Sequence, residues 1–117
     1  MEQELAAGNY VIAGGDFNQT FSTVDLSRYP AQEGKWASGI IDTADFGSGW
    51  QFLMTDSLPS CRSLDQVYAG ADKTSFQYYV IDGFILSSNI EVLSFEIADL
   101  DFVCSDHNPA VLTFRLR

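Results

Sequence analysis

Basic residues are scarce in this sequence. Six lysines and arginines stand against sixteen aspartates and glutamates, which gives a formal net charge of −10 at pH 7. Proteins that bind duplex nucleic acid neutralise its phosphates with clustered Lys and Arg, and the sequence contains no such cluster. The charge therefore argues against a long duplex as partner. An acidic protein can still act on phosphate esters when a bound cation supplies the local positive charge.

Cysteine and long apolar runs are also in short supply. Cys61 and Cys104 are the only cysteines, and their spacing does not specify a disulfide, so two free thiols buried as small hydrophobic side chains are favoured. No apolar run approaches the roughly 20 residues of a membrane helix, and no signal-peptide pattern occurs. We expect no membrane segment in this chain.

The hydrophobic residues that are present suffice for one core. They make up 46% of the 117 residues, and we expect a single domain over residues 1–117. Helix formers over residues 1–8 precede an apolar strand over 9–15, whose composition predicts burial on both faces. Because the chain opens with the end of a helix running into a strand, we expect a piece of a longer protein.

The later segments carry strand patterns. Residues 21–30 suggest a short helix, 31–50 a loop, and 50–56 a strand or short helix. Aromatic and β-branched residues over 75–88 and alternation in the last third predict at least three strands, among them one with Val111, Thr113 and Arg115 on the side opposite Leu112, Phe114 and Leu116. The expected fold class is α/β (α+β), with one mixed, mostly antiparallel β-sheet and flanking helices.

Three short segments place polar groups next to apolar runs. "GGDFN" puts Asp16 and Asn18 on one side of an extended segment at a strand end; alone, it could be a capped glycine turn. Asp82 in "YVIDGFILS" could sit in a hairpin turn. "CSDHNPAV" carries Asp106 and His107, the only histidine. Adjacent Ser, Asp and His cannot form a nucleophile relay, which disfavours a serine hydrolase.

Together and in this order, "GGDFN", "IDGFILS" and "SDHNPAV" resemble the endonuclease/exonuclease/phosphatase family of magnesium-dependent phosphoesterases. The resemblance covers Val11 to Phe114. It implies that the chain is the C-terminal half of this family's catalytic domain, a four-layer α/β sandwich of two sheets packed face to face with helices outside. It also places Asp82 within a strand facing the histidine, which argues against the hairpin.

The resemblance implies a role for each matching residue. Asp16 would act in proton transfer at the scissile phosphate, and Asn18 would position the phosphate or the attacking water. His107 would contact the phosphate or transfer a proton, and Asp82 would accept its hydrogen bond and fix its orientation. Asp106 would lie at the metal site, which we expect to take Mg²⁺ or Mn²⁺ through oxygen ligands.

The sequence also departs from the family. The family's main metal ligand is a Glu from the N-terminal half of the domain, and Glu2 and Glu4 lie in the wrong place to match it. We therefore expect weak metal binding and no appreciable turnover of a phosphate-ester substrate without the N-terminal half. The alternative is a non-catalytic half-domain that binds or self-associates. In either case an exposed apolar sheet face predicts a homodimer.

Overall fold

The computed structural model describes residues 1–117 and consists mainly of strands. The helical elements are α1 (Glu2–Ala6) and two 3₁₀ turns, η1 (Thr43–Asp45) and η2 (Lys73–Ser75). The strands are β1 (Ile12–Asp16), β2 (Gln19–Phe21), β3 (Gly39–Ile41), β4 (Trp50–Leu53), β5 (Cys61–Arg62), β6 (Tyr78–Tyr79), β7 (Asp82–Ser87), β8 (Ile90–Ile97) and β9 (Ala110–Leu116). None of the helices has the length and hydrophobicity that a membrane span requires.

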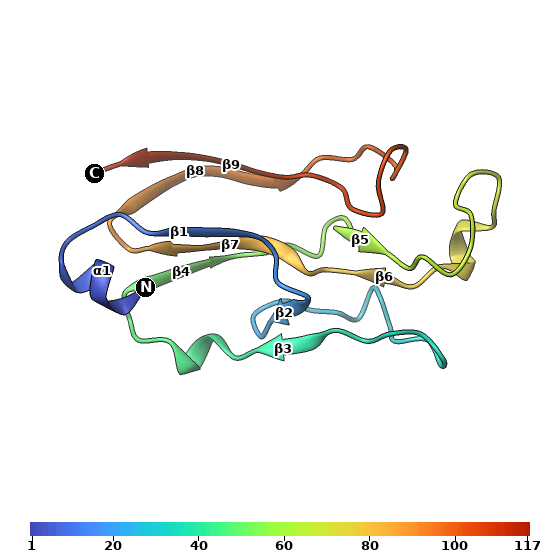
Figure 1. Cartoon of the computed structure of the whole chain (residues 1–117), viewed down its shortest axis with the longest axis horizontal. Helices are drawn as coiled ribbons and strands as arrows, with labels where there is room; N and C mark the ends of the chain where they lie inside the picture. Colours follow the sequence, from blue (N-terminus) through green and yellow to red (C-terminus); the bar gives the residue numbers. More distant parts are fainter.

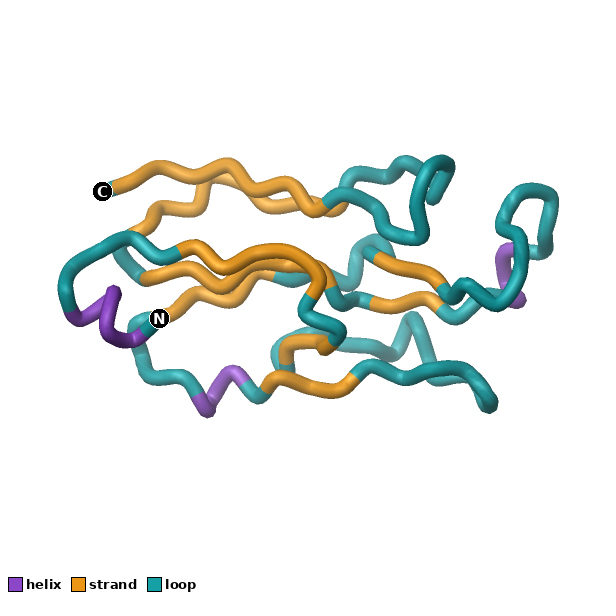
Figure 2. Tube along the Cα trace, in the orientation of Figure 1, coloured by secondary structure: helices purple, strands orange, loops and turns teal.

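The strands form a layered, sheet-rich α+β arrangement, which confirms the expected class. In place of the one sheet that the sequence suggested, the strands form a central sheet of order β1-β7-β4 and the separate pairs β2–β3, β5–β6 and β8–β9. Only β2 and β3 run parallel. Figure 1 shows the β8–β9 ribbon on one side of the central sheet and β2–β3 on the other, with β5–β6 extending to the right. The helical part is smaller than the flanking helices that the sequence suggested (Figure 2).

Both faces of the central sheet carry packed side chains. On one face Phe21, Trp50 and Ile85 form a buried cluster. On the other face Phe84 of β7 meets Phe95 of β8 edge to face, with 5.9 Å between the ring centroids. The central sheet is therefore covered by β2 on one side and by the β8–β9 ribbon on the other.

Strand β1 differs from its prediction. The apolar composition predicted burial on both faces, but four of its five residues are exposed, among them Ile12. The reason is topological, because β1 lies at the edge of the sheet and pairs only with β7. Composition describes how apolar a strand is, whereas position in the sheet decides how much of it is covered.

The β8–β9 ribbon keeps one apolar face in spite of an irregularity. Its pairing shifts between Val92 and Ser94, so that Leu93 is an extra residue on β8. Beyond a bulge of this kind, each side chain of the bulged strand points to the face opposite the one that strict alternation would give it. The residues of β8 that pair with Leu112, Phe114 and Leu116 are consequently all apolar: Phe95, Val92 and Ile90. The predicted alternation along β9 is thereby confirmed.

The segment over residues 21–30 forms turns instead of the expected short helix. The carboxylate of Asp25 accepts a hydrogen bond from the Ser27 backbone N–H at 2.9 Å. Asp and Ser side chains that bond to nearby backbone groups compete with helix formation. The hydrogen bond from Ser27 to Asp25 therefore stabilises a turn in place of the helix.

The dipeptide Asp82-Gly83 does not form a hairpin turn. Asp82 begins β7, and Gly83 pairs with Gly15 inside the sheet, as the resemblance predicted. A Cβ added to Gly83 would lie 2.2 Å from the backbone oxygen of Leu53 in β4. Glycine is needed here because the backbone of the neighbouring strand leaves no space for a side chain.

Replacing Gly83 by alanine is expected to lower the free energy of unfolding by about 1–3 kcal/mol, because the methyl group forces β4 away from β7. The measurement is urea denaturation followed by circular dichroism. Gly47→Ala is the matched control, since a Cβ at Gly47 meets no atom within 4 Å. Equal effects of the two substitutions would contradict the close approach of the two strands.

Candidate active site

Two aspartates from neighbouring strands lie side by side at one end of the central sheet. Asp16 is the last residue of β1 and Asp82 is the first residue of β7, and the two are partners in the antiparallel register. The chain leaves the strand immediately after Asp16, while the backbone N–H of Phe17 still donates to the Ile81 carbonyl at 2.9 Å. The end of this strand pair therefore presents both carboxylates close together.

An isolated bridge to β5 brings His107 to the same end of the sheet. Cys61 of β5 forms an isolated antiparallel bridge with His107. The Arg62 N–H donates to the Asp106 carbonyl at 2.9 Å, and the Asn108 N–H donates to the Ser60 carbonyl at 2.8 Å. The segment that carries Asp106 and His107 is thus held against β5 by backbone hydrogen bonds.

His107 lies at the centre of the resulting cluster. Its Nδ1 lies 2.8 Å from Oδ2 of Asp82. Because an ionised carboxylate only accepts hydrogen bonds, we assign the proton to Nδ1. The opposite ring nitrogen, Nε2, lies 3.8 Å from Oδ2 of Asp16 and 3.8 Å from Oδ2 of Asp106. The arrangement places an oriented imidazole nitrogen between two carboxylates.

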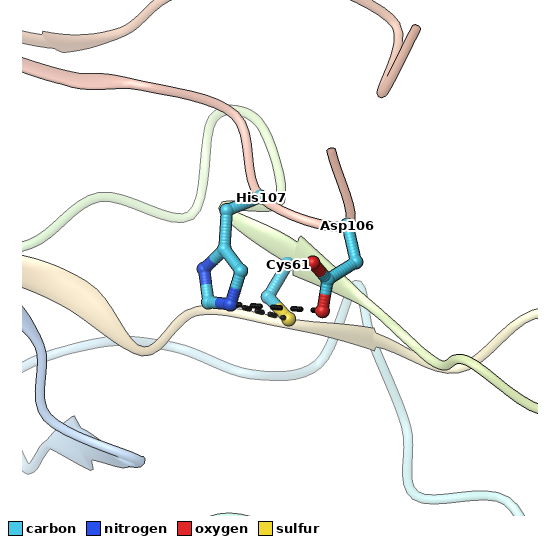
Figure 3. Close-up of side chains that lie close together, drawn as sticks. All are labelled: Cys61, Asp106 and His107. Carbon is cyan, nitrogen blue, oxygen red and sulfur yellow. Dashed lines mark hydrogen bonds and ion pairs between the residues drawn. The ribbon is translucent and has the colours of Figure 1, made fainter. Parts of the chain in front are cut away.

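The sulfur of Cys61 approaches the same nitrogen. Its Sγ lies 3.5 Å from His107 Nε2, and Figure 3 shows Cys61 and Asp106 both directed toward this side of the ring. Cys61 is buried and Cys104 is exposed, and both are free thiols. The expectation of free thiols is confirmed, whereas the expected burial applies to Cys61 alone.

The backbone of Asn18 holds the Asp16 carboxylate in place. Its N–H donates to Oδ1 of Asp16 at 2.8 Å, and its φ of 53° lies in the left-handed region that asparagine tolerates better than most residues. This turn fixes the Asp16 carboxylate. Asn18 lines the same cavity as Asp16, so the two residues that the sequence singled out do lie together, although the chain turns at Asn18 and is not extended there as expected.

Burial changes the protonation of two groups in the cluster. Burial raises the pKa of Asp82 above its ordinary value, and hydrogen bonds from His107 and Ser60 oppose this change. Burial and the nearby charges of Asp106, Asp82 and Asp16 raise the pKa of the Cys61 thiol to about 12. The thiol is therefore protonated at neutral pH in the absence of a cation.

The cluster opens into a cavity of about 510 Å³. Besides Asp16, Asp106 and His107, its wall includes Lys35, Arg62 and the half-exposed Trp36. Lys35 is paired with Asp65 at 2.7 Å, and the guanidinium of Arg62 lies over the Tyr68 ring, 4.6 Å from its centroid. The cavity thus has a wall of mixed charge and an aromatic rim. Its volume suits a small-molecule substrate.

Sequence reasoning missed two residues that organise this site. The Ser60 hydroxyl oxygen accepts hydrogen bonds from the backbone N–H groups of Ile81 and Asp82 at 3.0 and 3.1 Å, and so fixes the start of β7. Cys61 places sulfur at the histidine. Both lie in "SLPSCRSL", a stretch without strand periodicity, so no pattern in the sequence indicated that it pairs with the histidine segment.

Comparisons of this chain with protein-family models, with curated proteins and with solved structures found no match.

Proposed function

We propose that this chain supplies the C-terminal half of the active site of a metal-dependent phosphoesterase, which hydrolyses a phosphodiester or phosphomonoester by in-line attack of water. The observation that carries the proposal is the convergence of Asp16, Asp106 and the Asp82-oriented His107 at one cavity. Three segments distant in sequence supply these groups.

Each group has a chemical task in such a reaction. Asp82 holds the imidazole ring through Nδ1, so that Nε2 faces the cavity and contacts or exchanges a proton with the phosphate. Asp16 is fixed by the Asn18 backbone and can accept a proton from the attacking water. The Asn18 amide offers a donor to a phosphate oxygen. Proton removal from the attacking water and proton exchange with the phosphate thus have separate residues.

The carboxylates at the cavity also offer ligands for the cation that we propose. Asp106 provides one of the one or two carboxylates that Mg²⁺ and Mn²⁺ take at phosphate-ester sites. When bound there, the cation would neutralise phosphate charge and acidify water. The three carboxylates of the wall, Asp16, Asp65 and Asp106, would otherwise repel a phosphate. The sulfur of Cys61 is the one donor that does not suit Mg²⁺.

The single histidine allows a direct test of ligand binding. Since the chain contains one histidine, its imidazole gives one set of NMR signals that needs no assignment. We expect dimethyl phosphate, added with Mg²⁺, to shift these signals in a saturable manner and Asp16→Asn to weaken the effect. No shift of the imidazole signals at saturating probe would contradict a phosphate-ester site at His107.

The isolated chain is expected to show no appreciable turnover, because it lacks a counterpart of the family's metal-binding glutamate. The measurement is hydrolysis of bis(p-nitrophenyl) phosphate with and without Mg²⁺. Magnesium-dependent turnover that Asp16→Asn abolishes would show that the chain is complete as a catalyst, against this expectation.

Reading the coding DNA upstream of Met1 supplies the matching positive test. A continuous frame with a strand that carries a glutamate and a later segment with a histidine would support the proposal. The longer chain should then hydrolyse the same ester with Mg²⁺ and lose this activity in the Asp16→Asn and His107→Ala variants. A longer chain without such activity would overturn it.

An exposed apolar surface favours a second candidate, a half-domain that associates with a second copy of itself. Phe114 and Leu116 belong to the apolar face of the β8–β9 ribbon, yet remain 39% and 52% exposed. The radius of gyration is 15.6 Å, compared with about 13 Å for a compact domain of this length. A second copy packed on this ribbon would cover the exposed apolar side chains.

Light scattering at micromolar concentration is expected to give the mass of a dimer. Replacing Phe114 and Leu116 together by serine should yield the monomer, because the substitutions remove apolar area from the proposed contact. Serine substitutions at Val67 and Val103, which are 79% and 77% exposed and lie outside the ribbon, serve as the control. A monomeric mass for the unmodified chain would exclude the homodimer.

A further inference from the structure

Cys61 is the one group at the cluster that hydrolysis of a phosphate ester does not use. It is only 6% exposed, and its sulfur lies 3.5 Å from Nε2 of His107. The Asp106 carboxylate lies within reach of both, since one ligand atom from each of these three residues falls within 4.8 Å of the others. Thiolate, imidazole and carboxylate together are ligands of zinc-type cations.

The separation of the donor atoms suits a tetrahedral ion. A zinc ion lies about 2.3 Å from a thiolate sulfur and about 2.0–2.1 Å from an imidazole nitrogen, and at the tetrahedral angle these bonds place the sulfur and the nitrogen about 3.6 Å apart. The observed distance between Sγ and Nε2 is 3.5 Å. Asp106 Oδ2 lies 3.8 Å from the same nitrogen, so a small rotation of its side chain would complete three bonds.

The structure also fixes the ligands in the manner of a metal site. His107 donates a hydrogen bond from Nδ1–H to Asp82, so the lone pair of Nε2 is directed at Cys61 and Asp106 (Figure 3). Carboxylate–histidine–metal arrangements of this kind set the tautomer and the ring orientation. The isolated bridge between Cys61 and His107, and the Arg62–Asp106 hydrogen bond, hold the backbones of all three ligands together.

We propose that Cys61, Asp106 and His107 form a binding site for a thiophilic divalent cation of the zinc class, with the fourth position open to Asp16 or water. Binding replaces the thiol proton, which passes to solvent, and involves no change of oxidation state. The side chains of His107 and Asp106 are 29% and 30% exposed, so the ion can enter from the cavity.

If the phosphoesterase proposal also holds, occupancy of this site by zinc has a consequence for that reaction. A cation bonded to Nε2 of His107 occupies the nitrogen that would face the phosphate. Zinc at this site would therefore exclude phosphate chemistry at the histidine, whereas Mg²⁺, which avoids sulfur, would leave Nε2 free. The cavity would thus distinguish the two kinds of cation by the ligand that each one prefers.

Cobalt(II) provides the test, because a cobalt–thiolate bond gives a charge-transfer absorption in the near ultraviolet that oxygen and nitrogen ligands do not give. Titrating Co²⁺ into the reduced full chain should produce this band with one equivalent bound, and Zn²⁺ should abolish it while Mg²⁺ should not. The Cys104→Ser variant is the matched control and should retain the band. Cys61→Ser and Cys61→Ala should lose it.

Two outcomes would overturn the proposal. One is the absence of the band in the unmodified chain, which would leave an S–H···N hydrogen bond as the whole relation between Cys61 and His107. The other is a band that persists without Cys61 and disappears without Cys104. Circular dichroism of each variant separates loss of a ligand from loss of the fold. Because no phosphate is present, the result does not depend on the phosphoesterase proposal.

Discussion

Replacing Phe21 by alanine is expected to lower the free energy of unfolding by about 3–5 kcal/mol, a large share of the total for a domain of this size. Phe21 is completely buried and forms a cluster with Trp50 and Ile85. Its ring lies 5.2 Å from that of Phe17 and 5.6 Å from that of Phe52, measured between centroids. Removing it would empty the centre of this face of the sheet.

The effect should be large because the core is small. Only 20 of 117 residues are buried, so few other side chains can compensate for a cavity at this position. Urea denaturation would measure the loss, with Val67→Ala, at a side chain that is 79% exposed, as a control within about 0.5 kcal/mol of the unmodified chain. Phe21→Leu should lower the free energy of unfolding by an intermediate amount, and this variant replaces Phe21→Ala in the measurement if the alanine variant does not fold.

A loss of less than about 1 kcal/mol for Phe21→Ala would mean that the packing of β2 on the central sheet contributes little. The parallel β2–β3 pair would then not be needed for the stability of the central sheet. In that case the turn that carries Asn18 would lack a stable support, because it leads directly from Asp16 into β2.

The sequence allowed the strands and the histidine pair to be predicted, for reasons that lie in local pattern. Alternation along residues 110–116 predicted β9, and the resemblance of the three polar segments to the phosphoesterase family implied the Asp82–His107 contact. Both depend on short stretches whose residue types are distinctive. The antiparallel pairing of β1 with β7, which brings Asp16 next to Asp82, was not predicted.

Other features depend on which strands become neighbours, and no local pattern records this. The exposure of β1 results from its position at the sheet edge. The sulfur of Cys61 reaches His107 only because β5 pairs with the segment after Asp106. The bulge at Leu93 was also unforeseen, although the apolar residues on either side of it, at Val92 and Phe95, fit a break in the alternation.

Removing the Asp82 carboxylate is expected to weaken cation binding at His107 by about 10–100-fold, which is the usual effect of deleting the group that orients a metal-ligating histidine. In the Asp82→Ala variant Nδ1 loses its acceptor at 2.8 Å, and the proton is free to move to Nε2. An imidazole that carries its proton on Nε2 has no lone pair to offer the cavity. Asp82 is thus a positioning residue.

The loss of binding should come with a small change in stability. Burial raises the pKa of the Asp82 carboxyl group, so the folded state binds the carboxyl proton more tightly than the unfolded state. The free energy of unfolding therefore falls as pH rises from the unfolded-state pKa of this group through its higher folded-state pKa. Asp82→Ala removes this dependence together with the cost of burying the charge. The unmodified chain should therefore lose more stability than the variant as pH increases from acid toward neutral.

Two measurements separate orientation from a merely structural role of Asp82. The ¹⁵N chemical shifts of the single imidazole report which nitrogen carries the proton, and they should show Nδ1–H in the unmodified chain and a mixture in Asp82→Ala. Cobalt titration gives the affinity, which Asp82→Asn should partly restore because its amide oxygen can still accept from Nδ1. Unchanged ¹⁵N shifts and unchanged cobalt affinity in Asp82→Ala would show that the backbone pairing of His107 with Cys61 suffices to orient the ring.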